Sequence, residues 1–597
     1  MTNYDIVIID SGLTLNSQPF SYGICIEKNN TGILISKDYK DEIGHGTIIY
    51  SIINKHVDAT KIFNIKLSQH QNEYDEACLV AALEYIKNNI TCKIINISLG
   101  IIVSDNLDKL YKVCSELTKS GCVIISAFDN EGCYSYPATF DCVIGVDSKN
   151  SIKKISEFDF VENSPINILA KGSIQRITMP DGKNIIVGGS SVACAHITSI
   201  LYKKISKNFN LQSALSYLKS KSKCIYSFSK LENQNNSTYF KINTAVVFPV
   251  SKEAHSFIRF SDMLSFYISD YYDVRQSGKV GRRLSTYYEE IKSDKCIMDI
   301  EHIDFEDVDT IILGHLDKIN YIYEHDYKAE LIKKAITNGI NIYSFDPLDR
   351  YIDMLNHSNI KYFYPEITQS NLPYNTFCKL YKISKPVVGI FGTSSQQGKF
   401  SLQLALKREL ELMDYNVGTI GTEPQSLLFD FDVVFPMGYN STVHLNNSEI
   451  VLYLNNEINK LCQKQKEIIL TASQAQTIPY CFNNLLEFPS MQYHFALGTR
   501  PDAIIICINY HDEIQYIRNT VYTLIGLTNA TVIAFVIYPF TYGNNQNGIY
   551  GTLKHKLDYT EYKEKYRILL DEFNIPTFML GNQKDVKDIC DLIIDFF

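Results

Sequence analysis

Short apolar runs alternate with amphipathic stretches over the first part of the chain. A short apolar run predicts a buried strand, whereas apolar residues that recur every three or four positions predict a helix. Strands that alternate with helices predict a parallel sheet covered by helices. The predicted strands cover 4–9, 61–67, 93–99 and 122–127, and the predicted helices begin at His45 and Ser191 and cover 75–88, 106–120 and 212–220.

The same alternation returns in two later parts of the chain. Apolar runs at 310–313 and 340–345 flank a helical pattern at 327–337, which is followed by Gly339, a residue suited to a helix C-terminus. The polar, Asn-rich run 231–237 is typical of a linker. We therefore expect an α/β protein with a first domain over residues 1–225, a linker over 226–243, a smaller α/β domain over 244–384 and a last α/β domain over 385–597.

Composition limits the classes of function. The chain has 57 Lys and Arg against 66 Asp and Glu, a net charge of −9, and no basic block, so a nucleic-acid partner is not expected. No apolar stretch approaches the ~20 residues of a membrane span. The first residues lack a secretory signal. We therefore expect a cytoplasmic protein without a membrane partner, whose 15 cysteines are reduced thiols and neither disulfides nor metal ligands.

Three polar residues stand at the ends of predicted elements. Asp10 ends a strand, and His45 and Ser191 each open a helix. The carboxyl ends of parallel strands, and the helices that follow them, meet at one edge of a sheet. In a Ser–His–Asp site the serine attacks, the histidine takes its proton and the aspartate orients the histidine. Each motif alone is more typical of a turn or a helix cap, but their order along the chain predicts such a catalytic site.

The motifs around these residues resemble the subtilase family of serine proteases. The likeness covers about residues 4–205 and implies a subtilisin-like, three-layer parallel-sheet domain. By this resemblance Asn130 donates its side-chain amide to the oxyanion, beside the backbone N–H of Ser191. The predicted substrate-binding strand ends in Ser98, Leu99 and Gly100.

Three positions depart from the subtilase pattern. Ser190 replaces the usual Thr before the nucleophile, Ala195 replaces a Pro, and Asp129 replaces the usual Gly before Asn130. An acid beside the oxyanion site would oppose the developing negative charge if it pointed inward. We expect Asp129 to point to solvent.

A glycine-rich loop lies between the predicted strand 386–391 and the predicted helix 402–412. A strand, a glycine loop, a Lys and a helix N-terminus together suit the binding of phosphates. The match to G-x-x-x-x-G-K-[ST] is imperfect, because five residues separate the two glycines and Phe replaces Ser or Thr. The candidate nucleotide-binding residues are Gly392, Thr393, Ser394, Ser395, Gln396, Gln397, Gly398, Lys399, Phe400 and Ser401.

This loop resembles that of dethiobiotin synthetase and, more closely, a related P-loop family in which the hydroxyl residue is displaced by one position. The resemblance implies that Lys399 contacts the terminal phosphates of ATP or GTP and that Ser401 contacts Mg²⁺. The predicted strand 467–470 lacks the Asp or Glu expected at the end of a metal-binding strand, so nucleotide binding is better supported than hydrolysis. The alternative is a loop that has lost its ligand. Residues from about 244 onward also resemble proteins of clostridial peptide-maturation systems.

Together these patterns favour an intracellular serine endopeptidase that cleaves a peptide or protein, with the leader of a ribosomally made precursor peptide as one candidate substrate. Proteolysis of this kind needs no cofactor and no metal. The C-terminal nucleotide-binding module would regulate cleavage or dock the substrate. The alternative is an NTP-binding regulatory or biosynthetic protein whose subtilase-like domain only binds peptides. The oligomeric state is not predicted.

Overall fold

The computed structural model describes residues 2–14, 22–29, 32–67, 69–70, 73–104, 106–206, 209–227, 238–286, 295–373, 377–438, 440–542 and 554–597. The chain forms two compact units. The first contains residues 1–230 and 373–384, and the second contains residues 231–372 and 385–597. Most of the predicted linker, including its Asn-rich run, lies outside the described residues.

The first unit is built on a ten-stranded sheet with the order β16-β12-β13-β11-β10-β9-β2-β5-β3-β4. Its central strands run parallel, as predicted, whereas the pairs β12–β13 and β3–β4 are antiparallel. The strands are β2 (Ile6–Asp10), β3 (Tyr22–Asn29), β4 (Gly32–Ser36), β5 (Ile62–Leu67), β9 (Ile94–Ile97), β10 (Val123–Ala127), β11 (Ile144–Ser148), β12 (Phe158–Val161), β13 (Ile168–Ala170) and β16 (Ile225–Tyr226).

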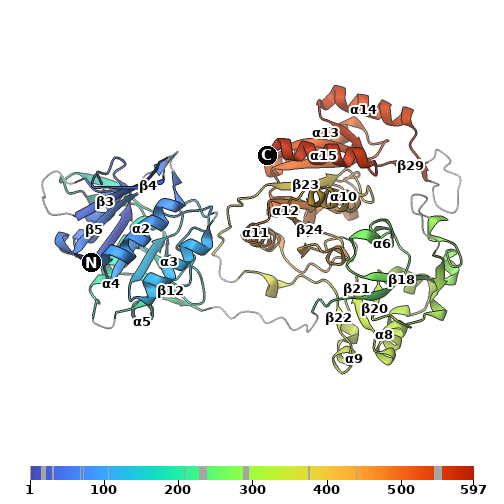
Figure 1. Ribbon diagram of the computed structural model, residues 1–597, viewed down its shortest axis with the longest axis horizontal. Coiled ribbons are helices and arrows are strands. Elements are labelled where there is room, and N and C mark those ends of the chain that lie inside the picture. The colour runs from blue at the N-terminus through green and yellow to red at the C-terminus, as the bar shows by residue number, and fades with distance from the viewer. Residues whose placement is uncertain are drawn as a thin grey trace. The chain divides into compact units, whose positions relative to one another are not determined.

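Helices cover both faces of this sheet, because alternate strand residues point to opposite sides. Ile6 and Ile8 pack in the cluster of one face, and Val7 and Ile9 pack in the cluster of the other. The helices of the first face are α1 (His45–Asn54), α4 (Ser190–Tyr202) and α5 (Leu211–Lys221), and those of the second are α2 (Glu76–Asn89) and α3 (Leu107–Lys119) (Figure 1).

The second unit contains two parallel sheets. One has the order β19-β18-β17-β20-β21-β22 and the other β25-β24-β26-β23-β27-β28-β31. The strands of the first are β17 (Thr244–Phe248), β18 (Tyr267–Asp273), β19 (Ile297–Asp299), β20 (Thr310–Leu313), β21 (Asn341–Ser344) and β22 (Tyr362–Phe363). Those of the second are β23 (Val387–Gly392), β24 (Val417–Gly421), β25 (Val433–Val434), β26 (Ile468–Ala472), β27 (Ala503–Ile508), β28 (Thr531–Ile537) and β31 (Thr577–Met579).

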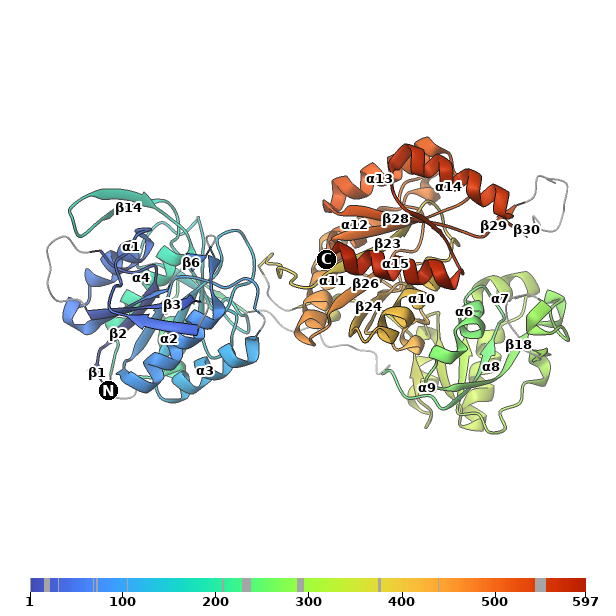
Figure 2. The ribbon, with the colours of Figure 1, turned by 45° about the horizontal axis from the view of Figure 1, so that its top comes forward.

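Helices also flank the sheets of the second unit. Beside the seven-stranded sheet, α10 and α15 contact each other, and α12 contacts both α11 and α13 (Figure 2). The helices are α6 (Ala254–Arg259), α7 (Asp317–Tyr323), α8 (Tyr327–Asn338), α9 (Ile352–Asn356), α10 (Lys399–Leu412), α11 (Asn447–Gln463), α12 (Ser490–Thr499), α13 (Ile514–Thr528), α14 (Tyr559–Phe573) and α15 (Gln583–Phe596).

The contacts divide the chain differently from the predicted domain boundaries. The six-stranded and seven-stranded sheets of the second unit share one hydrophobic cluster, which joins Val247 and Phe257 to Phe429 and Leu402. This shared core places both sheets in a single unit. Residues 373–384, expected at the end of the smaller domain, pack instead with the first unit. None of the helices in the described part of the chain is long and apolar enough to cross a membrane.

Candidate functional site

Three adjacent strands bring the predicted catalytic residues to one edge of the first sheet. The strands β10, β9 and β2 are neighbours and run parallel. Asp10 is the last residue of β2, Ser98 directly follows β9, and the segment that carries Asn130 follows β10. The edge at the carboxyl ends of parallel strands is where α/β folds place their ligands.

Asp10 and His45 are hydrogen-bonded. The His45 Nδ1 lies 2.7 Å from Asp10 Oδ1, and that oxygen also accepts the backbone N–H of Ser11 at 2.7 Å. Asp10 is almost fully buried, whereas 36% of the His45 side chain is exposed. Because Nδ1 faces the carboxylate, it carries the proton and Nε2 is left as the basic nitrogen. The negative charge of Asp10 raises the pKa of His45 above its usual 6.5, against the effect of burial.

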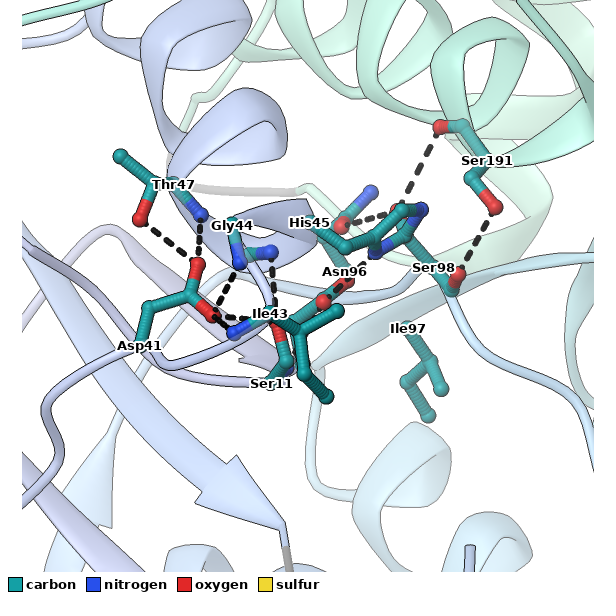
Figure 3. A network of polar contacts seen from close by, with 12 residues as sticks. Ser11, Asp41, Ile43, Gly44, His45, Thr47, Asn96, Ile97, Ser98 and Ser191 are labelled. Carbon is teal, nitrogen blue, oxygen red and sulfur yellow. Dashed lines mark hydrogen bonds and ion pairs between the residues drawn. The ribbon is translucent and has the colours of Figure 1, made fainter. Parts of the chain in front are cut away.

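A second carboxylate, Asp41, which belongs to none of the sequence motifs, anchors the start of α1. One oxygen accepts the Ser11 hydroxyl at 2.9 Å and the Gly44 N–H at 2.7 Å, and the other accepts the Thr47 N–H at 2.8 Å and its hydroxyl at 2.6 Å (Figure 3). These bonds outweigh burial and lower the pKa of Asp41. Asp41 therefore holds the turn that presents His45. A polar residue just before an apolar-periodic helix is the signal that could have identified it.

Ser191 lies in the first turn of α4, where it is predicted to act as the nucleophile. Its hydroxyl donates to the Ser98 carbonyl at 2.9 Å (Figure 3). Among the described residues, no hydrogen bond joins Ser191 to His45. A catalytic Ser191 would have to rotate away from Ser98 before His45 could deprotonate it. Hydrogen bonds of a catalytic site are often formed only once substrate is bound.

The Asn130 side chain is fixed next to Ser191. Its Oδ1 accepts the backbone N–H of Ser190 at 2.8 Å and lies 2.9 Å from the Ser190 Oγ. Because the acceptor Oδ1 faces the Ser190 N–H, the other terminal atom of the side chain is the donor Nδ2. A Cβ on Gly189, which has φ +121°, would lie 2.7 Å from Asn130 Oδ1, so glycine is needed there. Ser190 thus performs a positioning task in the place of the usual Thr.

Asp129 is half-buried, and its carboxylate accepts hydrogen bonds from its own loop. One oxygen accepts the Glu131 N–H at 2.7 Å and lies 3.4 Å from the Cys133 nitrogen. Its backbone N–H donates to the Ser135 hydroxyl at 3.0 Å. The acid therefore stabilises the loop after β10, and its charge is directed at backbone N–H groups of that loop.

The predicted substrate-binding residues continue from β9. Ser98 and Leu99 are buried, and a Cβ on Gly100 would lie 2.8 Å from the Ser135 side chain. Ile101 then exchanges two backbone hydrogen bonds with Tyr136, at 3.0 and 2.8 Å. The segment after β9 is thus held against the segment that follows Asn130.

Two further side chains of α4 belong to the core. Cys194 is fully buried and burial raises the pKa of its thiol, so it is unsuited to act as a second nucleophile. Burial lowers the pKa of His196 to about 4, and its Nε2 lies 3.2 Å from Gln175 Oε1. Both side chains are structural.

The glycine-rich loop of the second unit lies between β23 and α10, as predicted. It borders a cavity of about 990 Å³ that is lined by Ser395–Ser401 and by Glu423, Gln425 and Ser473. The Lys399 ammonium is buried and donates to the Ser394 carbonyl at 2.7 Å. Burial lowers its pKa to about 8.

Some candidate residues of this loop do not line the cavity, and others make contacts elsewhere. Gly392, Thr393 and Ser394 are not among the lining residues. The Thr393 hydroxyl donates a hydrogen bond to Asp512 and accepts one from the Gln397 side-chain amide, so it stabilises the loop. The Phe400 ring packs 5.9 Å from Phe429, between ring centroids, which explains an aromatic residue where Ser or Thr is usual.

The described residues contain no group of three or more His, Cys, Asp or Glu side chains arranged to hold a metal ion. Glu423 nevertheless borders the same cavity as Lys399, and its pKa is raised by burial and by Glu253. Asp432, an acid that follows the next strand, instead accepts the Thr419 N–H at 3.0 Å and pairs with Lys466.

Comparison with known proteins finds a family match within the first unit. Residues 3–221 match the model of the subtilase family, Peptidase_S8. Proteinase T of Parengyodontium album is 24% identical over 212 residues, which span 32% of this chain and 68% of that protein.

Two solved structures are similar to portions of the chain. A DUF1611 family protein from Anabaena variabilis is similar at 12% identity with a TM-score of 0.41, over 60% of this chain and all of that one. The prenylagaramide maturation protease PagA is similar at 20% identity with a TM-score of 0.28, over 36% of this chain and 82% of that one. Given the family match, residues 3–221 form a subtilase domain, and the protein is a serine endopeptidase.

Proposed function

We propose that Asp10, His45, Ser191 and Asn130 carry out peptide-bond cleavage. The supporting observation is the 2.7 Å bond from the buried Asp10 to His45, at the edge where Ser191 and Asn130 also lie. His45 Nε2 takes the proton of the Ser191 hydroxyl once that hydroxyl leaves Ser98, and Ser191 Oγ attacks the scissile carbonyl. His45 then protonates the leaving amine. The Asn130 Nδ2 and the Ser191 N–H stabilise the oxyanion.

A fluorophosphonate probe tests this assignment without knowledge of the substrate. The wild-type protein is expected to be labelled, and the Ser191→Ala variant is not. Ser199→Ala, a buried serine on the same helix, serves as the matched control and retains labelling. An unlabelled wild type would instead favour a subtilase-like module that only binds peptides.

We further propose that the substrate is a peptide processed inside the cell, such as the leader of a ribosomal precursor. The support is the sequence resemblance of the C-terminal part to peptide-maturation proteins. The experiment incubates the enzyme with precursor peptides encoded beside its gene and identifies the products by mass spectrometry. A single cut between leader and core is expected, and uncut precursors contradict the proposal.

A nucleotide is our proposed ligand for the second unit. The supporting observation is the cavity at Ser395–Ser401, where the buried Lys399 has no carboxylate partner within the described residues. Gln425 Oε1 and Ser473 Oγ, two buried atoms of lining residues, also lack hydrogen-bond partners there. ATP or GTP with Mg²⁺ would place its phosphates at the loop N–H groups and Lys399.

Binding of fluorescent ATP and GTP analogues, with Mg²⁺ and without it, tests the nucleotide proposal. Lys399→Ala is expected to weaken binding at least tenfold, whereas Lys464→Ala, an exposed lysine of the same unit, does not. Peptide cleavage measured with and without nucleotide then shows whether the ligand regulates the protease. Equal weak binding by wild type and Lys399→Ala contradicts the proposal.

A further inference from the structure

Residues 377–381 lie far outside the subtilase match, which ends at 221, yet they pack on the subtilase domain. We call this segment the strap. Its backbone adds to the loop after β10, because the Tyr134 N–H donates to the Leu380 carbonyl at 3.0 Å, next to a parallel bridge between Cys133 and Leu380. In sequence, this return to the first unit falls after the six-stranded sheet and before the seven-stranded sheet of the second unit.

The strap covers a small hydrophobic cluster of the protease domain. The cluster contains Phe128 and Tyr134, and Phe377 and Tyr381 of the strap pack against it. The ring centroids of Tyr134 and Tyr381 are 4.5 Å apart. Tyr134 is only 2% exposed with the strap in place, so the strap completes the burial of this ring.

Lys379 is the polar centre of this contact. It is only 5% exposed, and its Nζ lies 3.0 Å from Asp147 Oδ2 and 5.4 Å from the centre of the Phe128 ring. A buried charge of this kind is strongly disfavoured without its partner. The pair with Asp147, a residue of β11, therefore fixes the strap at one position on the domain.

Phe128, whose ring lies beside Lys379, is two residues before Asn130 of the proposed oxyanion site. The Phe128 carbonyl accepts the Ser190 hydroxyl, and Asn130, two residues further, accepts the Ser190 N–H at 2.8 Å. The strap thus contacts both flanks of the loop that carries Asn130: the Phe128 ring before it and the Tyr134 ring after it.

We propose that the strap positions the Asn130 oxyanion donor and thereby sets the catalytic rate of the protease. Lys379 and Tyr381 are its positioning residues. The proposal rests on the role of Asn130 proposed above. No group of the strap touches the reacting atoms; it acts through the loop 128–134.

The test measures the rate constant of labelling by a fluorophosphonate in the full-length chain, per folded enzyme. Lys379→Met and Tyr381→Ala are expected to slow labelling about tenfold, and Lys379→Arg, which keeps the charge, to restore most of the rate. Lys382→Met, the same change at an exposed neighbour, leaves the rate unchanged. Asn130→Ala alone should slow labelling by about 100- to 1000-fold.

The double variants decide the mechanism. In an Asn130→Ala background, Lys379→Met should have little further effect, because the donor that it positions is already absent. The same tenfold loss in both backgrounds, or no loss in either, overturns the strap proposal. An Asn130→Ala variant with a wild-type rate would instead refute the oxyanion role itself, so the two failures are distinguishable.

Discussion

Two His–Asp pairs in the described part of the chain have the same bond length and different surroundings. His45 Nδ1 lies 2.7 Å from Asp10, and His315 Nδ1 lies 2.7 Å from Asp346. In both pairs the aspartate is at or just after the end of a parallel strand. The bond alone therefore does not identify a catalytic histidine.

The surroundings separate the two pairs. The His45 side chain is 36% exposed, whereas that of His315 is 11% exposed and packs edge-on against Phe345. The second oxygen of Asp346 accepts the Leu316 N–H at 3.0 Å, but Asp10 Oδ2 has no hydrogen-bond partner within the described residues. His315 links two strand ends beside Glu253 and Glu423, whereas the more exposed His45 lies at the sheet edge that also carries Ser191.

The strongest test of this comparison removes each carboxylate in turn. Asp10→Asn is expected to lower the rate of fluorophosphonate labelling by about 10⁴-fold, the loss typical of a triad whose histidine is held in the wrong tautomer. Asp346→Asn should leave the labelling rate unchanged and lower the melting temperature. Similar losses of labelling in both variants would show that the two pairs are functionally linked.

The dependence on pH sharpens the same contrast. Labelling needs neutral His45, and Asp10 raises the pKa of His45, so the rate should rise with pH through a value above 6.5. Asp10→Asn removes the charge that stabilises the protonated ring, so the residual rate should titrate at lower pH. Asp346 raises the pKa of His315 against the effect of burial, and Asp346→Asn should lower that pKa alone. NMR titration of the two imidazoles checks both shifts.

The smallest expected effect concerns Asp41. Asp41→Asn should cost about 1–3 kcal/mol of unfolding free energy at pH 7, because buried donors lose their acceptor. The folded-state pKa of Asp41 is lowered, so its contribution is present above the unfolded pKa and is lost as the pH falls through the folded value. Urea unfolding at pH 7 and pH 3 should show the difference shrink in acid. Asp38→Asn, at an exposed position nearby, is the control.

The sequence predicted the elements that carry the chemistry better than the contacts that hold them. Asp10 and His45 were identifiable because an apolar strand ends at the first and an apolar-periodic helix begins at the second. The edge strand β4 was not, because all of its residues are exposed or half-buried and no apolar face marks it. The Ser191–Ser98 bond was not predictable either, since it depends on a side-chain rotamer.

Long-range contacts explain the remaining differences. Asp41 is separated from Ser11 by 30 residues, and nothing in the local pattern indicates that their side chains bond. The strap is a more extreme case, because Leu380 pairs with Cys133, which lies far earlier in the sequence. Periodicity describes neighbours along one element, so it cannot show a segment that returns from beyond another sheet.

The strap also has a consequence for the order of events during synthesis. The catalytic residues Asp10, His45 and Ser191 are all made before residue 200, but Lys379 is made only after the whole six-stranded sheet of the second unit. A growing chain that stops short of Lys379 lacks the cover of its Asn130 loop. On the strap proposal, the protease therefore gains its full activity late in translation, after most of the chain has been made.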